Sequence, residues 1–395
     1  MKIGGAHLTY CSNIHPAESW PETFAALSHH IPPIKAQVAP DAPFGIGLRL
    51  SARAAAELAG GDALDEFRAY LRDANAYVFT INGFPYGDFH GTRVKEQVYA
   101  PDWQSADRLT YTNRLADILA ALLPDDVETG SISTVPGSFA PWAKGNEAAM
   151  AEGLITATAH LVALRARTGK TITLALEPEP WCFLETVAEA VAFFRAHLHS
   201  DAAAYRLAAL SGLTVTDAAT ALRRHLGLCY DVCHAALAYE DAAGSVKALQ
   251  RAGIGIFKLQ LSSALRFAAI TPDSAARLRP FDEPTYLHQV IERAEGGSAR
   301  KWPDLGAALA EIDSAMGREW RVHFHVPLFL PQMDGFDTTQ DMLRQILALH
   351  RSAGISAHLE VETYTWDVLP AAYRNQPLPD AIARELNWVR AELQA

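Results

Sequence analysis

The stretch that decides the fold is Leu226-Gly-Leu-Cys-Tyr-Asp-Val-Cys-His-Ala-Ala236, a short apolar run whose last residues are polar. Side chains alternate between the two faces of a strand, so Cys229 and Asp231 share one face while Leu228 takes the other. In an α/β barrel the inward face at the carboxyl end is the one that reaches a substrate. A buried carboxylate there must be paired, hydrogen-bonded or metal-bound. Asp231 would equally suit the N-cap of a following helix, and this stretch alone favours neither role.

Composition places the chain among ordinary globular proteins with a large core. It has 395 residues, of which 49% are hydrophobic and 20% charged, and its mean hydropathy is near zero. An α/β barrel of this length forms one domain, so we expect residues 1–395 to be a single domain. The formal net charge of -11 argues against a general binder of nucleic acid or of anionic membranes.

The four cysteines, Cys11, Cys182, Cys229 and Cys233, form no CxxC pair and no disulfide framework. This pattern favours a reducing cytoplasm, and we expect Cys182 and Cys233 to pack as small buried hydrophobes. The N-terminal residues lack the apolar run of a signal peptide, and the sequence contains no uncharged apolar segment of about 18 residues. We therefore expect a cytoplasmic protein that is neither secreted nor inserted in a membrane.

Short strand-like runs alternate with helical ones along the chain, which is the pattern of parallel βα units. Ser19 and Glu22 form a capping box at the start of the first helix. The glycine- and proline-containing loop from 82 to 91 is a candidate wall of an active site. We predict a (β/α)8 TIM barrel with one extra strand or an insertion between strands 7 and 8, because nine strands are predicted: 2–10, 44–50, 77–81, 130–135, 171–176, 226–231, 254–261, 321–326 and 356–362.

Several predicted strands end in side chains that can bind a metal. By strand parity these side chains point into the barrel, and two prolines hold the loop after the fifth strand rigid. Carboxylate, imidazole and amide groups together suit a divalent cation such as Mn²⁺, Mg²⁺, Co²⁺ or Zn²⁺. A single residue of this kind is more often structural, but five at the same end of successive strands favour a metal site. The candidate ligands are Glu177, Asp231, Gln260, His325 and Glu362.

The chain resembles the xylose-isomerase-like TIM barrels, which include sugar isomerases, epimerases and apurinic endonucleases. The resemblance rests on Leu-Ala-Leu-Glu177, Cys-Tyr-Asp231-Val-Cys-His234, Leu-Gln260-Leu-Ser-Ser-Ala-Leu-Arg266 and Leu-Glu-Val-Glu362. In the ketose epimerases of this superfamily a Glu, an Asp, a His and a Glu hold one divalent metal. The resemblance implies Glu177 and Glu362 as catalytic acid and base, and His234 and Arg266 as substrate contacts.

Gln260 departs from this pattern, because a histidine ligand is expected at its position. Either its amide oxygen binds the metal more weakly, or His325 supplies the imidazole, or metal binding has been lost. Lys258 shares the inward parity of Gln260, and we expect it to contact the substrate. We expect the same of His15 and Trp366, which follow the first and last strands.

The whole chain further resembles the EboE-type metabolite traffic proteins of biosynthetic gene clusters. The matching motifs are Cys-Ser-Asn-Ile-His15-Pro-Ala-Glu-Ser-Trp20, Gly-Phe-Pro-Tyr-Gly-Asp-Phe-His90-Gly, Val-His-Phe-His325-Val-Pro and Glu-Val-Glu-Thr-Tyr-Thr-Trp366. This resemblance implies a role in handling a small-molecule precursor. The expected partners are that metabolite and either a second copy of the chain or proteins of the same biosynthetic cluster.

The function predicted from these features is that of a metal-dependent sugar isomerase or epimerase acting on a small metabolite. A carrier that keeps the barrel and pocket without chemistry is the alternative, and Gln260 favours it. An apurinic endonuclease is disfavoured by the negative net charge and by the lack of a basic stretch near the barrel mouth.

Overall fold

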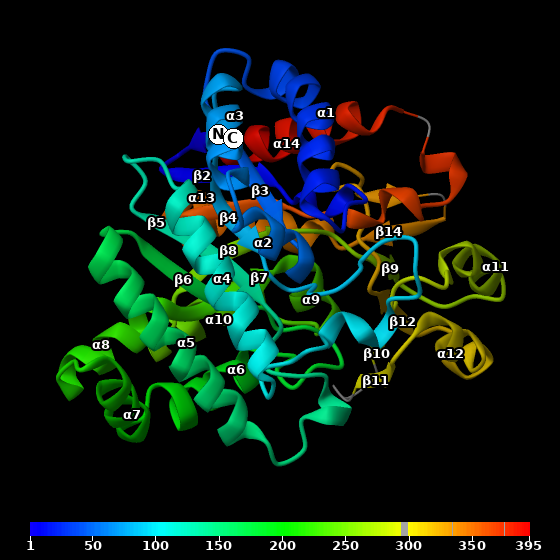
Figure 1. The fold of residues 1–395 in the computed structure, drawn as a ribbon. Coiled ribbons are helices and arrows are strands. Elements are labelled where there is room, and N and C mark those ends of the chain that lie inside the picture. The colour runs from blue at the N-terminus through cyan, green and yellow to red at the C-terminus, as the bar shows by residue number, and fades with distance from the viewer. Residues whose placement is uncertain (294–298, 334, 375) are drawn as a thin grey trace.

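A parallel barrel forms the core of the computed structural model, which describes residues 1–293, 299–333, 335–374 and 376–395 (Figure 1). Its strands run in the sheet order β2-β15-β8-β7-β6-β5-β4-β3, and a short N-terminal strand, β1 (Lys2–Ile3), pairs antiparallel with β2. This order confirms the predicted TIM barrel. The barrel strands are β2 (Ala6–Tyr10), β3 (Phe44–Arg49), β4 (Ala76–Asn82), β5 (Thr129–Thr134), β6 (Thr171–Leu176), β7 (Leu226–Asp231), β8 (Ile256–Leu261) and β15 (His358–Val361).

The barrel closes between β2 and β3 through one backbone bridge, from Cys11 to Gly47, and through the side chain of Thr9. The Thr9 hydroxyl accepts a hydrogen bond from the Gly47 amide at 2.9 Å and donates one to the Gly45 carbonyl at 2.7 Å. Gly47 leaves room for this approach, because a Cβ there would overlap the carboxylate of Glu360 and the carbonyl of Tyr10. The closure therefore depends on a residue without a side chain.

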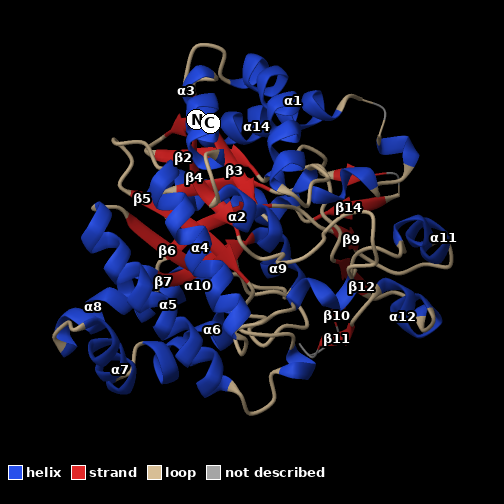
Figure 2. Cartoon of the chain, viewed as in Figure 1, coloured by secondary structure: helices blue, strands red, loops and turns tan. Residues whose placement is uncertain are grey.

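Helices surround the barrel, as Figure 2 shows. The capping box of Ser19 and Glu22 is present at the start of the first helix. The last helix, α14, packs against the first. The helices of the outer layer are α1 (Trp20–Val38), α2 (Ala52–Leu58), α3 (Ala63–Asp73), α4 (Ala106–Leu122), α5 (Glu147–Thr168), α6 (Val187–Phe193), α7 (Asp201–Ser211), α8 (Val215–His225), α9 (Val232–Leu237), α10 (Ala242–Ala252), α13 (Gln340–Ala353) and α14 (Leu378–Gln394).

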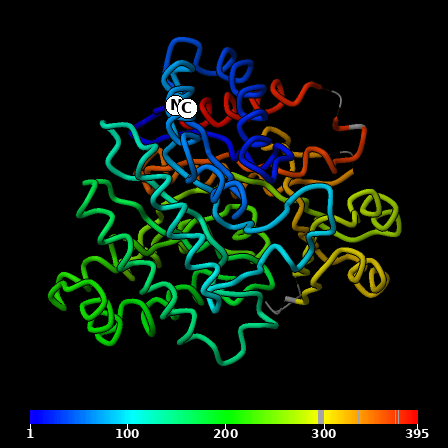
Figure 3. Tube along the Cα trace, viewed as in Figure 1, coloured from blue at the N-terminus to red at the C-terminus, as the bar shows by residue number. Residues whose placement is uncertain are grey.

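The connection from β8 to β15 carries a second, antiparallel sheet with strand order β11-β10-β12-β9-β14-β13. This insertion forms the yellow-green to orange part of the trace beside the barrel in Figure 3. The predicted surplus strand is β12, which belongs to this sheet and not to the barrel. The elements are β9 (Leu265–Phe267), α11 (Ser274–Leu278), β10 (Val290–Arg293), β11 (Ala299–Trp302), α12 (Leu305–Leu309), β12 (Glu319–Val322), β13 (Gln332–Met333) and β14 (Phe336–Thr338).

Contacts across the barrel interior confirm the predicted strand parity. His358 on β15 hydrogen-bonds the Ser131 hydroxyl on β5 at 2.8 Å. Lys258 on β8 donates to the Ser133 hydroxyl at 3.3 Å and forms an ion pair with Glu360 on β15 at 2.6 Å. Both members of that ion pair are fully buried, so the barrel centre is polar but charge-balanced. Among the residues that the structure describes, no helix combines the length and the apolar character needed to cross a membrane.

Candidate metal centre and substrate pocket

Three carboxylates from three strand ends meet at the mouth of the barrel. Glu177 follows β6, Asp231 ends β7 and Glu362 follows β15. One ligand oxygen from each lies within 4.8 Å of the other two, and all three residues are buried. The convergence that strand parity predicted is confirmed. Oxygens at this spacing can share one divalent cation.

Asp231 both caps a helix and faces the other carboxylates. Its Oδ1 accepts from the backbone amide of His234 at 3.0 Å, which caps α9, and from the Ser262 hydroxyl at 2.7 Å. Its Oδ2 is buried and has no hydrogen-bond partner among the residues that the structure describes, and the same holds for Oε2 of Glu177. The two roles that the sequence left open are therefore divided between the two oxygens of one side chain.

The three carboxylates repel one another in a buried site. Burial, followed by the charges of Glu362 and Asp231, raises the pKa of Glu177 well above its ordinary value. Burial and then the charge of Asp231 raise the pKa of Glu362 to about 8. Such groups need either protons or a cation, because isolated buried charges are strongly unfavourable. The unpartnered oxygens and the raised pKa values both fit a divalent cation held by Glu177, Asp231 and Glu362.

Gln260 lies beside this cluster at the end of β8. Its amide is fully buried, and within the described part of the chain neither polar atom forms a hydrogen bond of normal geometry. It nevertheless approaches Glu362 closely enough to oppose the rise in the pKa of that carboxyl. An amide oxygen at this position can add a neutral ligand, which binds borderline metals more weakly than imidazole does.

His325 reaches the mouth from the insertion, in the extended segment after β12. Its imidazole lies within 4.8 Å of Asp231 and His234, and it does not join the set formed by Glu177, Asp231 and Glu362 within the described part of the chain. Its Nδ1 hydrogen-bonds the backbone carbonyl of Glu362 at 2.7 Å. The insertion thus places an imidazole next to the carboxylates without completing their shell.

A pocket that is partly open to solvent lies above the cluster. Its floor includes Glu177, Glu362 and His234. The loop after β4 and the insertion form its walls, and their apolar side chains Phe89, Val94 and Tyr286 pack together. The backbone amides of residues 94 and 95 both donate to the carbonyl of Thr285 at 2.9 Å, which joins the two walls. The predicted wall loop therefore lines the pocket.

Four of the expected substrate contacts do not line this pocket. His15 hydrogen-bonds Tyr10 at 2.8 Å and stacks on a histidine of α1, behind the barrel wall. The ammonium group of Lys258 forms its ion pair with Glu360 inside the barrel. Arg266 lies on β9 and pairs with a glutamate of β12 at 3.1 Å. Trp366 is buried under the loop after β15, whereas its neighbour Tyr364 faces the pocket. Of the five expected contacts, His234 remains in the site.

Several residues of the site had no individual prediction. The side-chain amides of Asn13 and Asn82 donate to Oε1 of Glu362 at 2.7 and 3.0 Å. Glu179 and His323 also line the pocket. Two of these residues could have been predicted from their positions. Asn82 ends a strand, and Glu179 lies two residues beyond Glu177, the acid that follows β6. The alternation of His323 and His325 with apolar residues indicated an inward-facing pair, although the insertion and not a barrel strand carries them. Asn13 gave no such signal, because a loop brings it into place.

No protein-family model matches this sequence, and no curated protein matches it. Solved structures do match over nearly the whole chain. A xylose isomerase-like TIM barrel protein from Mycobacterium smegmatis, solved in complex with magnesium, is 12% identical with a TM-score of 0.52 and covers 98% of this chain and 96% of its own. A D-allulose 3-epimerase from Methylomonas sp. is 11% identical with a TM-score of 0.49 and covers 98% of both chains.

An L-ribulose 3-epimerase is 11% identical with a TM-score of 0.48, and covers 98% of this chain and 95% of its own. The match to the Mycobacterium smegmatis structure, together with the strand order of the barrel, shows the xylose isomerase-like TIM-barrel fold. At these identities the likeness concerns the fold alone, so the activity has to be argued from the site.

Proposed function

We propose that this protein is a divalent-metal-dependent isomerase or epimerase of a small carbonyl-bearing, polyhydroxylated metabolite. The observation that carries this proposal is the meeting of Glu177, Asp231 and Glu362 beside a partly open pocket that Glu177 and Glu362 line. Magnesium in the Mycobacterium smegmatis structure and the epimerase activity of two proteins of similar fold are consistent with it.

Glu177 and Glu362 are the proposed acid and base, on opposite faces of the bound substrate. A divalent cation held at the cluster would polarise the substrate carbonyl and acidify the adjacent C–H. One carboxylate then takes that proton, and the other carboxyl returns a proton to the opposite face. Asn13 and Asn82 hold Oε1 of Glu362 by hydrogen bonds, which fixes the orientation of its other oxygen.

The charges around the pocket favour an uncharged substrate over a phosphorylated one. Glu177, Glu179 and Glu362 all line it. The ammonium group of Lys95, which also lines the pocket, pairs with Asp304 at 2.6 Å. A phosphate would therefore find the lining ammonium group of Lys95 already paired, whereas hydroxyl groups can donate to the carboxylates of the pocket.

The test is proton exchange in D₂O with unphosphorylated ketoses and aldoses, followed by NMR in protein loaded with Mn²⁺ or Co²⁺. We expect deuterium to enter at the carbon next to the carbonyl. Glu177→Gln and Glu362→Gln should each slow exchange by ~10²- to 10⁴-fold, the usual contribution of a general acid or base. Exposed Glu311→Gln is the control. Exchange at the original rate in both site variants would refute these roles.

A carrier without chemistry is the second candidate, and the neutral Gln260 at the cluster is the observation that favours it. In that case the protein would bind a sugar or a related metabolite in calorimetry without any deuterium exchange. In either case we propose that the protein handles a small-molecule precursor, as EboE-type metabolite traffic proteins do, and that it does so in the cytoplasm. Its proposed partners are a second copy of the chain or proteins of the same biosynthetic cluster. The motifs shared with those proteins support this role.

A further inference from the structure

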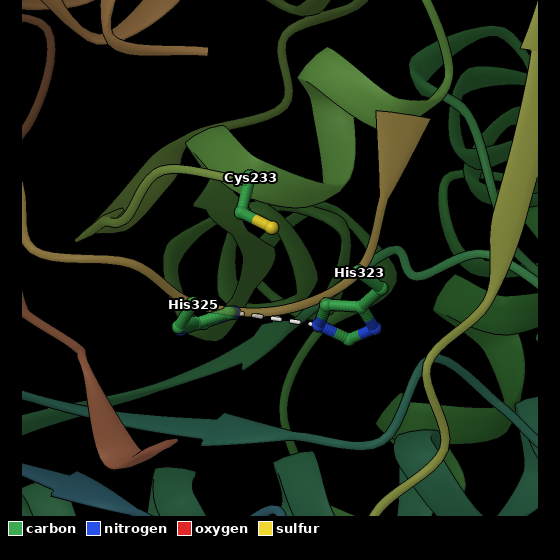
Figure 4. A group of neighbouring side chains, drawn as sticks. All are labelled: Cys233, His323 and His325. Carbon is green, nitrogen blue, oxygen red and sulfur yellow. Dashed lines mark hydrogen bonds between the residues drawn. The ribbon is translucent and has the colours of Figure 1, made fainter. Parts of the chain in front are cut away.

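A second group of ligand-type side chains lies beside the three carboxylates. His323 and His325 come from the extended segment after β12, and Cys233 comes from the first turn of α9. Ligand atoms of these three residues lie within 4.8 Å of one another, and all three residues are buried. Figure 4 shows the Cys233 sulfur above the space between the two imidazoles. His234 adds a third imidazole, with its Nε2 3.2 Å from Nε2 of His323.

Hydrogen bonds behind the rings fix which nitrogen of each imidazole carries the proton. Nδ1 of His325 faces the carbonyl of Glu362 at 2.7 Å, and Nδ1 of His234 faces the carbonyl of Pro178 at 3.0 Å. A carbonyl only accepts, so each Nδ1 must donate. In the neutral form of each ring the Nε2 then keeps its lone pair.

His323 is fixed in the same way by Gln289. Its Nδ1 lies 2.6 Å from Oε1 of Gln289. The amide nitrogen of Gln289 donates to the carbonyl of Pro180 at 3.2 Å and to the Tyr99 hydroxyl at 2.9 Å, which sets the orientation of the amide. Metal-binding histidines in proteins typically donate their second N–H to an oxygen in this manner.

The spacing of the lone pairs matches the coordination shell of a transition metal. Nε2 of His323 lies 3.4 Å from Nε2 of His325. Two acceptors at this distance repel each other unless a cation or a proton lies between them. Zn–N bonds of about 2.0–2.1 Å at a tetrahedral angle separate two nitrogens by about 3.3–3.4 Å.

We infer that His323, His325 and Cys233 form a second metal site for a thiolate-accepting transition metal such as Zn²⁺. Binding forms one metal–sulfur bond and breaks the S–H bond of Cys233, whose proton leaves to solvent. Imidazole and thiolate prefer Zn²⁺ or Co²⁺ to Mg²⁺, whereas the neighbouring carboxylates suit a harder cation. This inference does not require the proposed isomerase activity, although His323 and His325 line the same pocket as Glu177 and Glu362.

The experiment is cobalt spectroscopy of the metal-free full chain. Bound Co²⁺ should show visible bands of tetrahedral coordination and a thiolate-to-cobalt charge-transfer band. Cys233→Ser should remove the charge-transfer band. Gln289→Leu removes a hydrogen bond behind a ligand and should weaken cobalt and zinc binding by ~10- to 100-fold. His325→Ala removes a ligand itself and should weaken binding by more than that.

Matched controls separate this site from the carboxylates and from folding defects. Cys182→Ser removes another buried thiol and His350→Ala another buried imidazole, and both should keep the full spectrum. Glu177→Gln combined with Glu362→Gln should also keep it while disabling the proposed active site. Circular dichroism checks that every variant is folded. A wild type without the charge-transfer band, or a band that survives Cys233→Ser, would overturn the inference.

Discussion

Metal-free protein should become less stable as the pH rises, because of Glu362. The pKa of this carboxyl is about 8 in the folded chain, where burial and Asp231 oppose its charge, against an ordinary value of 4.5. Between these two values the folded state holds a proton that the unfolded state has lost, so the free energy of unfolding falls with pH. The contribution is complete below pH 4.5 and lost above pH 8.

The magnitude follows from the width of that window. One extra proton changes stability by about 1.4 kcal/mol for each pH unit. A window from 4.5 to about 8 gives an upper value of ~5 kcal/mol, shared with Glu177, which interacts with the same charges. A bound divalent cation should reverse the trend, because it replaces the protons and binds more tightly as they leave.

Urea denaturation at pH 5, 6.5 and 8, with and without Mn²⁺, measures this effect. Glu362→Gln should flatten the pH dependence of the metal-free protein. Glu385 is a buried carboxyl outside the three-carboxylate group that accepts from the Thr363 hydroxyl at 2.7 Å, and its pKa is raised to about 7. It contributes a slope of its own, which Glu385→Gln measures separately. If the metal-free wild type and Glu362→Gln lose stability equally between pH 5 and 8, the reasoning about the carboxylate cluster is wrong.

Two further predictions concern the neighbouring strand β8. Lys258→Met should lower the free energy of unfolding by ~3–5 kcal/mol in denaturant titrations, because it leaves the buried Glu360 unpaired. Adding Glu360→Gln to this variant should recover most of the loss. If Lys258→Met alone is as stable as the wild type, the ion pair has no structural role. Gln260→His should tighten Mn²⁺ or Co²⁺ binding in calorimetry by restoring an imidazole, and unchanged affinity would show that residue 260 does not contact the metal.

The barrel and the carboxylates were predictable because they depend on local patterns. Strand parity and strand-end position suffice to bring Glu177, Asp231 and Glu362 together in any parallel barrel. Parity also directed Lys258 inward correctly, but it could not show that Glu360 opposite would neutralise it. Whether an inward side chain reaches the mouth depends on its depth in the barrel, which is a property of the assembled strands.

The antiparallel sheet of the insertion could not be predicted from local sequence patterns. Its strands β9 to β14 are short, and their pairings join distant residues, such as Arg266 with Arg321 and Asp337. The alternation of polar and apolar residues around His323 and His325 therefore predicted one more barrel strand, at residues 321–326. Arg266, expected at the substrate because of its distance from Gln260, follows the chain into the antiparallel sheet and leaves the mouth.

The separation of the two sheets has a consequence for how the molecule opens. Among the described residues, the strand-to-strand hydrogen bonds of the antiparallel sheet join strands of the insertion only. The links from the insertion to the barrel side are single bonds, such as those from the backbone amides of residues 94 and 95 to Thr285 and from Arg321 to the carbonyl of Ala236. We therefore expect the insertion to open as a cooperative unit once these links break. Its opening would withdraw His323 and His325 while β6, β7 and β15 kept the carboxylates in place. Amide hydrogen exchange should then divide the protein into a slow barrel and a faster insertion, and zinc should slow exchange in the insertion selectively.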